Sequence, residues 1–468
     1  KNKDKAMKVL RSRIYDMEQE KAKVNRITEG SIFGQLLLFF FPILFGTFFQ
    51  QLYNIIDSII VGNYVGADAL AAVGASASIT FLFVAIATGL SIGSSVVISQ
   101  HFGAKRYGEM KTAIQTVLLA SFVIALCLML VGIFGTDAIL RFMQTPQKIF
   151  SDASLYLKIY FCGLVFLFLY NMLTASFNAI GDSKSPLVFL ALSSVCNIVL
   201  DLYFVTKLKM GVAGAALATD ISQAISVVVS FLWLCTRMKK MKTQQKSRIF
   251  DLHILEIVCN VAVPSRLQQS MVSIGIFLVQ RLVNGYGEAV MAGYAAATKI
   301  DSIAILPMVN VGNAVSTFTA QNIGGKKPER GKEGFRAGLL MSAVIGVIVT
   351  GILLVYAKVF VGLFMDSSSN QAAIATGIEY LRVVGLFYAL MGIMNTCTGV
   401  LRGAGDILWF LMVTLINLSS RVILAYSMSG MLGAKAIWWS IPIGWGIGFA
   451  IGFVRYLSGK WQKSSLIE

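Results

Sequence analysis

Asp57 is a carboxylate inside an apolar run that begins near Phe33, and only uncharged residues surround it until Asp68. An ionised carboxylate in the middle of a bilayer costs about 2.5–3.5 kcal/mol even on lenient insertion scales, so it persists only where it faces protein or water. Gln50, Asn54 and Asp57 stand at i, i+4 and i+7, which places three polar groups on one helical face. Because lipid offers no hydrogen bonds, this face must look into a cavity or toward a partner helix.

A second polar stripe follows in a later apolar run, where Ser194, Asn197 and Asp201 stand at i, i+3 and i+7, and the next run adds Thr219. Counted at ~1.5 Å per residue from the nearer ends of their runs, Asp57, Asp201 and Thr219 reach the same depth. The sequence therefore predicts that three helices point oxygen atoms at one level of the membrane.

Two carboxylates in one pocket of low dielectric constant are not both charged without compensation, so either one binds a proton or a small cation lies between them. Carboxylate, amide and hydroxyl oxygens suit a hard ion such as Na⁺, or a proton. The alternative is that an acid forms a static hydrogen bond between two helices. Keeping two carboxyl groups inside the membrane for packing alone is costly, which disfavours this alternative.

The composition places these acids in an integral membrane protein, because 56% of the 468 residues are hydrophobic and 13% are charged, against ~25% charged in soluble domains. Twelve apolar runs are long enough to span a bilayer as helices. We therefore predict an all-α, polytopic protein with spans at about 34–61, 70–100, 112–135, 153–180, 186–205, 211–236, 255–283, 289–320, 335–357, 374–401, 405–425 and 432–456.

The net charge of +17 comes from basic residues that gather in the two tails and in alternate loops, such as Lys105, Arg106, Lys326 and Lys327. The positive-inside rule then predicts a protein of the inner membrane with both termini in the cytoplasm. The same rule accounts for the positive charge, so no nucleic-acid partner is expected. The first thirty residues lack the apolar core of a secretory signal. We interpret Lys5 to Glu20 as a cytoplasmic amphipathic helix or a solvated overhang.

The chain repeats itself. QHFGAKRYG at 100–108 returns as QNIGGKKPE at 321–329, and Pro42, Gly181 and Gly211 have counterparts in Pro264, Gly405 and Gly433. Six spans in each half make the two halves parallel repeats, and transport sites lie between or within such halves. We predict a cytoplasmic segment at 1–30, one lobe at 31–236, a linker at 237–251, a second lobe at 252–458 and a cytoplasmic tail at 459–468.

At these residues the chain closely resembles the multidrug and toxic compound extrusion (MATE) family of transporters, from about Gly30 to Tyr456. The matching features are Asp57 ahead of VGNYVGADALAAVG, NIVLD at 197–201, the Thr of GAALAT at 219, the QHFGAK/QNIGGK pair and the six-plus-six repeat. The resemblance implies a monovalent-cation site at Asp57, Asn197, Asp201 and Thr219, coupled to efflux of amphipathic, often cationic compounds.

The second lobe departs from the pattern of some relatives, since its seventh and tenth spans offer Gln269 and Asn395 but no acid in mid-membrane. It carries Asp301 in the eighth span, and Arg421 takes the repeat position of Asn197. If Asp301 pairs with a basic residue, a structural role and a functional role for that pair are equally expected. We count as cavity or accessory polar residues Gln50, Tyr53, Asn54, Gln269, Asp301 and Arg421.

The sequence motifs argue against an enzyme or an ATP-driven pump. The segment most similar to a nucleotide-binding loop, GGKKPERGK at 324–332, has the wrong glycine spacing for one. The sequence predicts a cation-coupled antiporter that exports a small organic molecule across the inner membrane. We expect no cofactor besides the coupling ion, Na⁺ or H⁺. The expected partners are the bilayer and a small-molecule substrate, and the protein is expected to be a monomer. A flippase for a lipid-linked or metabolite precursor, and a membrane scaffold or enzyme subunit, are the alternatives.

Overall fold

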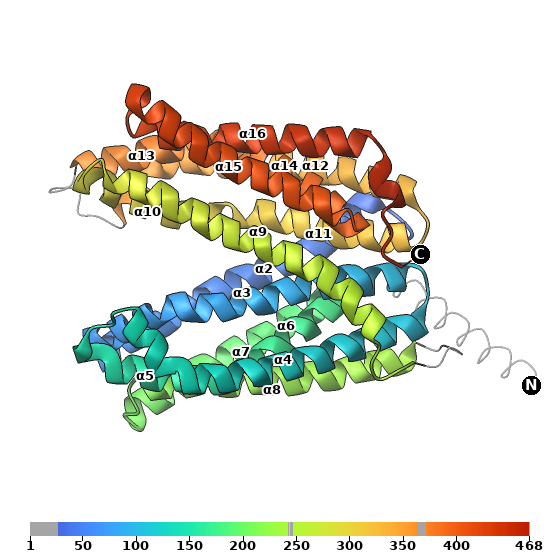
Figure 1. Ribbon diagram of the computed structural model, residues 1–468, viewed down its shortest axis with the longest axis horizontal. Coiled ribbons are helices and arrows are strands. Elements are labelled where there is room, and N and C mark those ends of the chain that lie inside the picture. Colours follow the sequence, from blue (N-terminus) through green and yellow to red (C-terminus); the bar gives the residue numbers. More distant parts are fainter. Residues whose placement is uncertain (1–26, 242, 244–246, 364–370, 468) are drawn as a thin grey trace, which may run out of the picture.

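The computed structural model describes residues 27–241, 243, 247–363 and 371–467, and these fold into a bundle of long helices (Figure 1). The amphipathic helix expected over Lys5 to Glu20 lies outside the described residues. The first half comprises α2 (Ile32–Ile60), the π-helical turn η1 (Val61–Val65), α3 (Ala67–Gly103), α4 (Tyr107–Phe142), α5 (Gln147–Cys162), α6 (Leu164–Ala179), α7 (Lys184–Asp201), the π-helical turn η2 (Leu202–Lys207) and α8 (Val212–Lys240).

The second half repeats this order with α9 (Leu252–Asn284), α10 (Glu288–Ala304), α11 (Leu306–Gly324), α12 (Pro328–Gly362), α13 (Gln371–Gly385), α14 (Tyr388–Ala404), α15 (Ile407–Leu432) and α16 (Lys435–Leu457). A short 3₁₀ turn, η3 (Lys460–Lys463), follows. In the described part of the chain, nine helical stretches are long and apolar enough to cross a membrane, and two bent helix pairs bring the number to eleven. With α9, a helix of 33 residues, the six-plus-six pattern is complete.

Three of the expected spans are not continuous helices. The run at 153–180 divides into α5 and α6 with a bend of 47°, and the run at 374–401 divides into α13 and α14 with a bend of 50°. The eighth span breaks at Ile305, where Pro307 occupies the first turn of α11. Proline has no N–H to donate to the preceding turn, so it is tolerated at a helix start and interrupts a helix interior.

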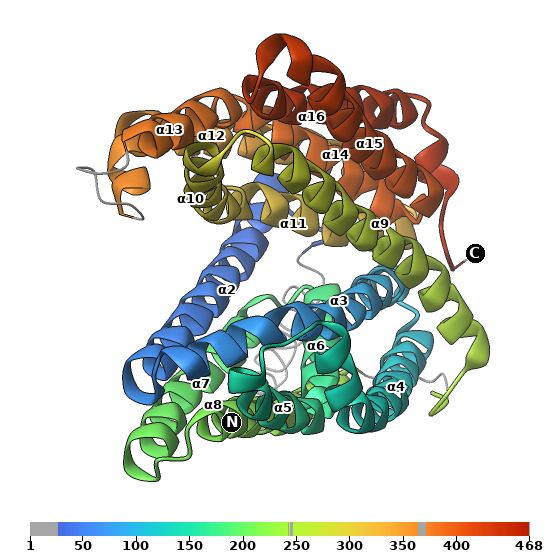
Figure 2. The ribbon, with the colours of Figure 1, turned by 60° about the vertical axis from the view of Figure 1, so that its left-hand side comes forward.

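The first helix of each half crosses to the other half (Figure 2). Leu36 and Phe40 of α2 are 1% exposed and belong to one apolar cluster with Val311 and Phe318 of α11. α9, the counterpart of α2 in the second half, packs against α3 of the first half. The two helices are so close that a Cβ on Gly93 would come within 2.7 Å of the Val258 carbonyl oxygen. The two halves are thus held together by exchanged helices, and α2 belongs to the cores of both.

The repeated motif forms a seal between the halves at the end of the bundle that carries Lys105 and Lys326, which we call the basic end. Gly103 and Gly324, the last residues of α3 and α11, lie against each other's helices: a Cβ on Gly103 would fall 1.8 Å from the Gln321 carbonyl oxygen, and one on Gly324 would fall 2.0 Å from that of Gln100. Only glycine permits this approach, because any other residue would place its Cβ inside a backbone atom.

The two glutamines of the motif complete the seal with reciprocal bonds across the halves. The Gln100 amide donates to the carbonyl oxygen of Gly403 at 3.2 Å, and the Gln321 amide donates to that of Ala179 at 2.6 Å. A buried carbonyl at a helix end must find a donor, and each half supplies one to the other.

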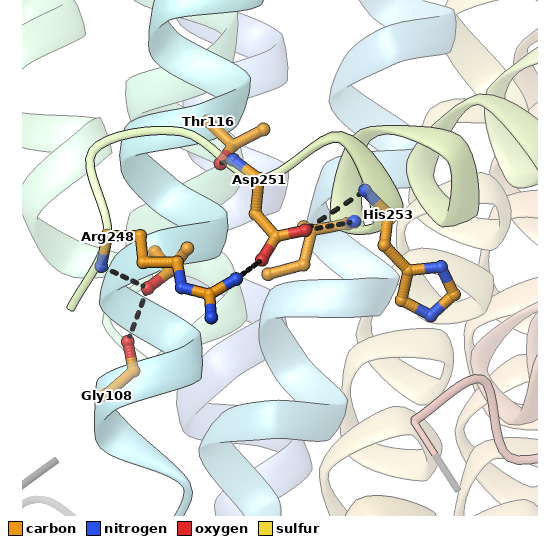
Figure 3. A network of polar contacts seen from close by, with 7 residues as sticks. Gly108, Thr116, Arg248, Asp251 and His253 are labelled. Atoms are coloured by element: carbon orange, nitrogen blue, oxygen red, sulfur yellow. Dashed lines mark hydrogen bonds and ion pairs between the residues drawn. The ribbon is translucent and has the colours of Figure 1, made fainter. Parts of the chain in front are cut away.

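The segment that leads into α9 is anchored on the first half (Figure 3). The Thr112 and Thr116 hydroxyl oxygens of α4 accept the backbone N–H groups of Arg248 and Asp251, each at 3.0 Å. Asp251 caps α9 by accepting the His253 N–H at 3.0 Å, and its other oxygen pairs with Arg248 at 3.2 Å. The start of α9 therefore takes its position from α4, which aims the helix toward α3.

Candidate functional site

The two acids of the predicted stripes come together. Asp57 of α2 and Asp201, the last residue of α7, lie close enough for their carboxyl groups to interact directly. Asp201 is fully buried and Asp57 is partly buried. Past these acids, each helix ends in a π-helical turn, η1 or η2, and the two turns touch. Single π-helical turns inside helices are frequent at functional sites.

The oxygens of this group lack donors. Both carboxylate oxygens of Asp201, Oδ1 of Asp57 and Oδ1 of the neighbouring Asn197 are buried, and no described residue donates a hydrogen bond to them. A buried acceptor without a donor costs about 1–3 kcal/mol, and more when it is charged. Four such oxygens beside one another suit a small hard cation or a shared proton. The donor set therefore fits the expected ion.

Thr219 of α8 organises the neutral part of the site. Its Oγ1 accepts the Tyr53 hydroxyl of α2 at 3.2 Å and the Asn197 amide of α7 at 3.3 Å, and its own hydrogen goes to the Ala215 carbonyl oxygen at 3.1 Å. A hydroxyl has one hydrogen and two lone pairs, so all of them are used. In this arrangement Thr219 joins three helices and leaves Asn197 Oδ1 free.

Further ionisable groups surround the pair. Tyr156 of α5 lies within electrostatic reach of Asp57, and Tyr160 lies within reach of Asp220 of α8. The Asp220 carboxyl lies on the Gly163 backbone at the bend between α5 and α6, where a Cβ would come within 1.9 Å of Oδ1. Asp220 thus faces away from the stripe, as its position one residue after Thr219 predicts, and packs at the break in the fourth span.

An apolar cluster closes the site on the side of η1 and η2. Ile60 and Val61 of the first span pack with Val205 and Val212 of the η2–α8 connection, and all four are 5% exposed or less. This cluster separates the acids from the end of the bundle opposite the basic end.

The other predicted residues on α2 fall differently. Gln50 and Asn54 are exposed, and neither side chain makes a hydrogen bond to the acids among the described residues. Tyr53, which was expected as an accessory residue, is the one that reaches Thr219. Ser194 is 9% exposed and donates to the Leu190 carbonyl of its own helix at 2.9 Å. The side chain of Gln269 lies outside the described residues.

Asp301 and Arg421 form a separate polar group in the second half. Asp301 of α10 accepts the Tyr388 hydroxyl at 2.5 Å and the Tyr380 hydroxyl at 3.5 Å, and Arg421 of α15 lies within electrostatic reach. The direct partners of Asp301 are therefore tyrosines, whereas the sequence had suggested a basic partner. No local pattern in the sequence indicates these partners, because Tyr380 and Tyr388 lie 79 and 87 residues beyond Asp301.

Aromatic rings enclose this second group. Trp438 stacks on Tyr294 at 5.8 Å between ring centroids and meets Tyr380 edge-on at 5.3 Å. The stem of Arg421 runs over Gly444, where a Cβ would approach it to 2.4 Å. The second half therefore keeps its acid in a packed aromatic shell, in contrast to the open oxygens of the first half.

Comparisons with known proteins agree with this arrangement. The family model described as MatE matches residues 42–203 and 264–427, one match in each half. The chain is 30% identical to the probable multidrug resistance protein YpnP of Bacillus subtilis (strain 168), over 95% of this chain and 99% of that protein. It is 27% identical to the probable multidrug resistance protein YoeA of the same organism, over 97% and 100% of the two chains.

A solved structure extends the similarity to three dimensions. An outward-facing conformation of a multidrug resistance MATE family transporter of the MOP superfamily superposes with a TM-score of 0.84 and 25% identity, covering 95% of this chain and 98% of that one. The twelve-helix arrangement of two six-helix repeats is thus the arrangement of known transporters.

Proposed function

Because this chain belongs to the MATE family of multidrug efflux transporters, which are not enzymes, we propose that it is a secondary antiporter coupled to Na⁺ or H⁺. The exported compounds are amphipathic, often cationic, small organic molecules. One observation carries the proposal: four buried oxygens of Asp57, Asn197 and Asp201 have no donor among the described residues. A coupling ion supplies the missing positive charge.

The residues of the proposed ion site have different roles. Asp57 and Asp201 bind the ion by charge, and Asn197 adds a neutral carbonyl oxygen. Thr219 and Tyr53 orient Asn197 and hold α2, α7 and α8 around it. For a proton, the two carboxyl groups share it, and for Na⁺, the amide oxygen enlarges the ligand set.

The orientation follows from the positive-inside rule. With the basic end in the cytoplasm, the seal formed by the α3 and α11 termini closes the cytoplasmic side, and both chain termini lie there in the inner membrane. The acids then lie in the outer half, where an ion loads from outside. Loading neutralises the carboxylates, α2 repacks, and the cavity opens inward for the next substrate molecule in an alternating-access cycle.

Transport into proteoliposomes tests the proposal. Purified protein is reconstituted alone as a monomer, and uptake of a fluorescent amphipathic cation such as ethidium is followed under an imposed pH gradient, an imposed Na⁺ gradient, or neither. We expect accumulation only when one of the two ion gradients is present. Equal transport without any gradient would contradict coupling, and gradient-driven transport in a variant that lacks both acids would contradict the site.

A further inference from the structure

α2 carries the acid of the ion site near one end and a polar contact with the second half near its middle. Thr47 precedes Asp57 by ten residues, a separation of about 15 Å along the helix and of about 80° around it. Asp57 faces α7 and α8, whereas Thr47 faces α11. A displacement of α2 that starts at the ion site therefore reaches the second half at Thr47.

The contact on the far side is with Asn310, which is 3% exposed. The Asn310 amide donates to Thr47 Oγ1 at 3.1 Å and to the Leu306 carbonyl oxygen at 3.0 Å, while Thr47 donates to the Ile43 carbonyl oxygen at 2.9 Å. Asn310 lies fourteen residues before Gly324, about 21 Å along α11 from the seal at the basic end. This contact is therefore deep in the bundle and separate from the seal.

The contact continues into α14. Asn313 approaches Asn310 Oδ1 at 3.5 Å, and Arg402 donates to Asn313 Oδ1 at 2.8 Å and to Ser316 Oγ at 3.1 Å. The guanidinium carbon also lies 5.7 Å from the centre of the Phe410 ring, so among the described residues its charge meets side-chain dipoles and an aromatic face, and no carboxylate. Arg402 lies in the last turn of α14, one residue before Gly403, whose carbonyl oxygen accepts Gln100 in the seal. The contacts that start at Thr47 therefore reach the basic end.

α11 and α14 pack in very close contact along their length. A Cβ on Gly403 would fall 2.1 Å from the Ser316 carbonyl oxygen, and one on Gly399 would fall 2.4 Å from that of Gly312. Helices in such close contact do not slide independently, because packed interfaces have discrete arrangements.

We propose that Thr47 and Asn310 form the link through which occupancy of the Asp57/Asp201 site is transmitted to Arg402 and the second half. When an ion binds and α2 shifts, Asn310 loses its Thr47 acceptor and keeps the Leu306 carbonyl, so one N–H of a buried amide is left unpaired. The cost of that N–H drives the Asn313 and Arg402 side chains to a second arrangement. This inference rests on the proposed function, since it needs an ion at the acids. It assigns Thr47 and Asn310 as positioning residues that do not touch the ion.

The test compares how strongly the ion weakens substrate binding. Dissociation constants for ethidium are measured on the full chain in lipid nanodiscs at low and saturating Na⁺, and again at low and high pH. Ion binding is measured separately without ethidium. Thr47→Val removes the hydroxyl at nearly constant shape, and Thr47→Ser retains it. The ionisable groups around the acids, Tyr53, Tyr156, Tyr160 and Asp220, remain in every variant.

We expect the ratio of the ethidium dissociation constant with ion to that without ion to fall at least threefold toward one in Thr47→Val, with ion affinity within twofold of the parent. Thr47→Ser and Thr88→Val keep the parent ratio. Thr88 of α3 is exposed, and its one hydrogen bond within the described part of the chain goes to the Val84 carbonyl of its own helix at 2.8 Å. A parent-like ratio in Thr47→Val overturns the link alone. A ratio of one in the parent protein overturns the proposed function, and the link with it.

Discussion

Thr219 determines how Asn197 is presented to the acids. The Asn197 amide nitrogen donates to Thr219 Oγ1 at 3.3 Å, so the amide oxygen is left without a donor beside Asp201. The same hydroxyl accepts Tyr53 from α2, which makes one threonine the junction of the three helices that build the ion site. The expected ligand set therefore contains one residue whose role in this arrangement is to orient the others.

Replacing Asp57 or Asp201 with Asn is expected to abolish gradient-driven efflux, because the change removes the charge that holds the ion and keeps the shape. Expression should stay near that of the parent, and the midpoint of thermal unfolding should hold or rise for Asp201→Asn, since a buried carboxylate without a donor is costly. Uptake in proteoliposomes and thermal unfolding measure the two effects. Asp68→Asn, at an exposed acid that pairs with Lys148, is the matched control. Undiminished export in both site variants would exclude the site.

Thr219→Val is expected to weaken coupling more than Thr219→Ser. Valine leaves the Tyr53 hydroxyl and the Asn197 amide without their shared acceptor, a loss of about 1–3 kcal/mol in a buried setting, whereas serine preserves it. The apparent ion affinity, read from the ion concentration that half-activates efflux, should fall about tenfold or more in the valine variant. Equal ion affinity in the two variants would show that the hydroxyl has no part in the site.

Asp301→Asn is expected to change stability or substrate affinity and to leave the ion dependence of transport in place. Asp301 accepts two tyrosine hydroxyls inside an aromatic shell, so its loss weakens packing in the second half. Tyr388→Phe should reproduce the loss of stability, about 1–3 kcal/mol, because it leaves a buried carboxylate oxygen with one donor fewer. If Asp301→Asn abolishes ion dependence as completely as Asp57→Asn, the coupling site lies in the other lobe.

Gly103→Ala is expected to open the seal at the basic end. A methyl group at this position meets the Gln321 carbonyl carbon and oxygen, 2.6 Å and 1.8 Å from the ideal Cβ, so the two halves cannot close fully. Labelling of a cysteine introduced at Ala104 by a membrane-impermeant maleimide, in inside-out vesicles, should become several times faster. Gly351→Ala is the control, because no atom of another described segment lies within 4 Å of a Cβ there. Unchanged labelling would contradict a seal made by these glycines.

Ion and substrate are expected to oppose one another by the same factor in both directions. A cation at the acids and a cationic substrate nearby repel each other in a medium of low dielectric constant. Linkage then requires that the factor by which the ion lowers substrate affinity equals the factor by which the substrate lowers ion affinity. Titrations of purified protein at fixed ionic strength measure both. Affinities independent of each other, for a substrate shown to be transported, would remove the basis for this antagonism.

The membrane class, the repeat, and the meeting of Asp57 with Asp201 were all predictable from the sequence. These features depend on local rules: apolar runs of span length, and the high cost of a carboxylate that faces lipid, which forces stripes on neighbouring helices to face one another. The pairing of Asn197 with Thr219 follows from the same rules, since α7 and α8 are consecutive and antiparallel.

Only the tertiary structure decided which helical faces meet. The sequence placed Gln50, Asn54 and Asp57 on one face of α2, but it did not show that Tyr53 reaches Thr219, because α2 packs against both halves and its buried faces change along its length. The tyrosine partners of Asp301 come from α13 and α14, about eighty residues away. Helix periodicity states which residues share a face, but the contacts of that face depend on the packing of distant segments, and no local pattern records it.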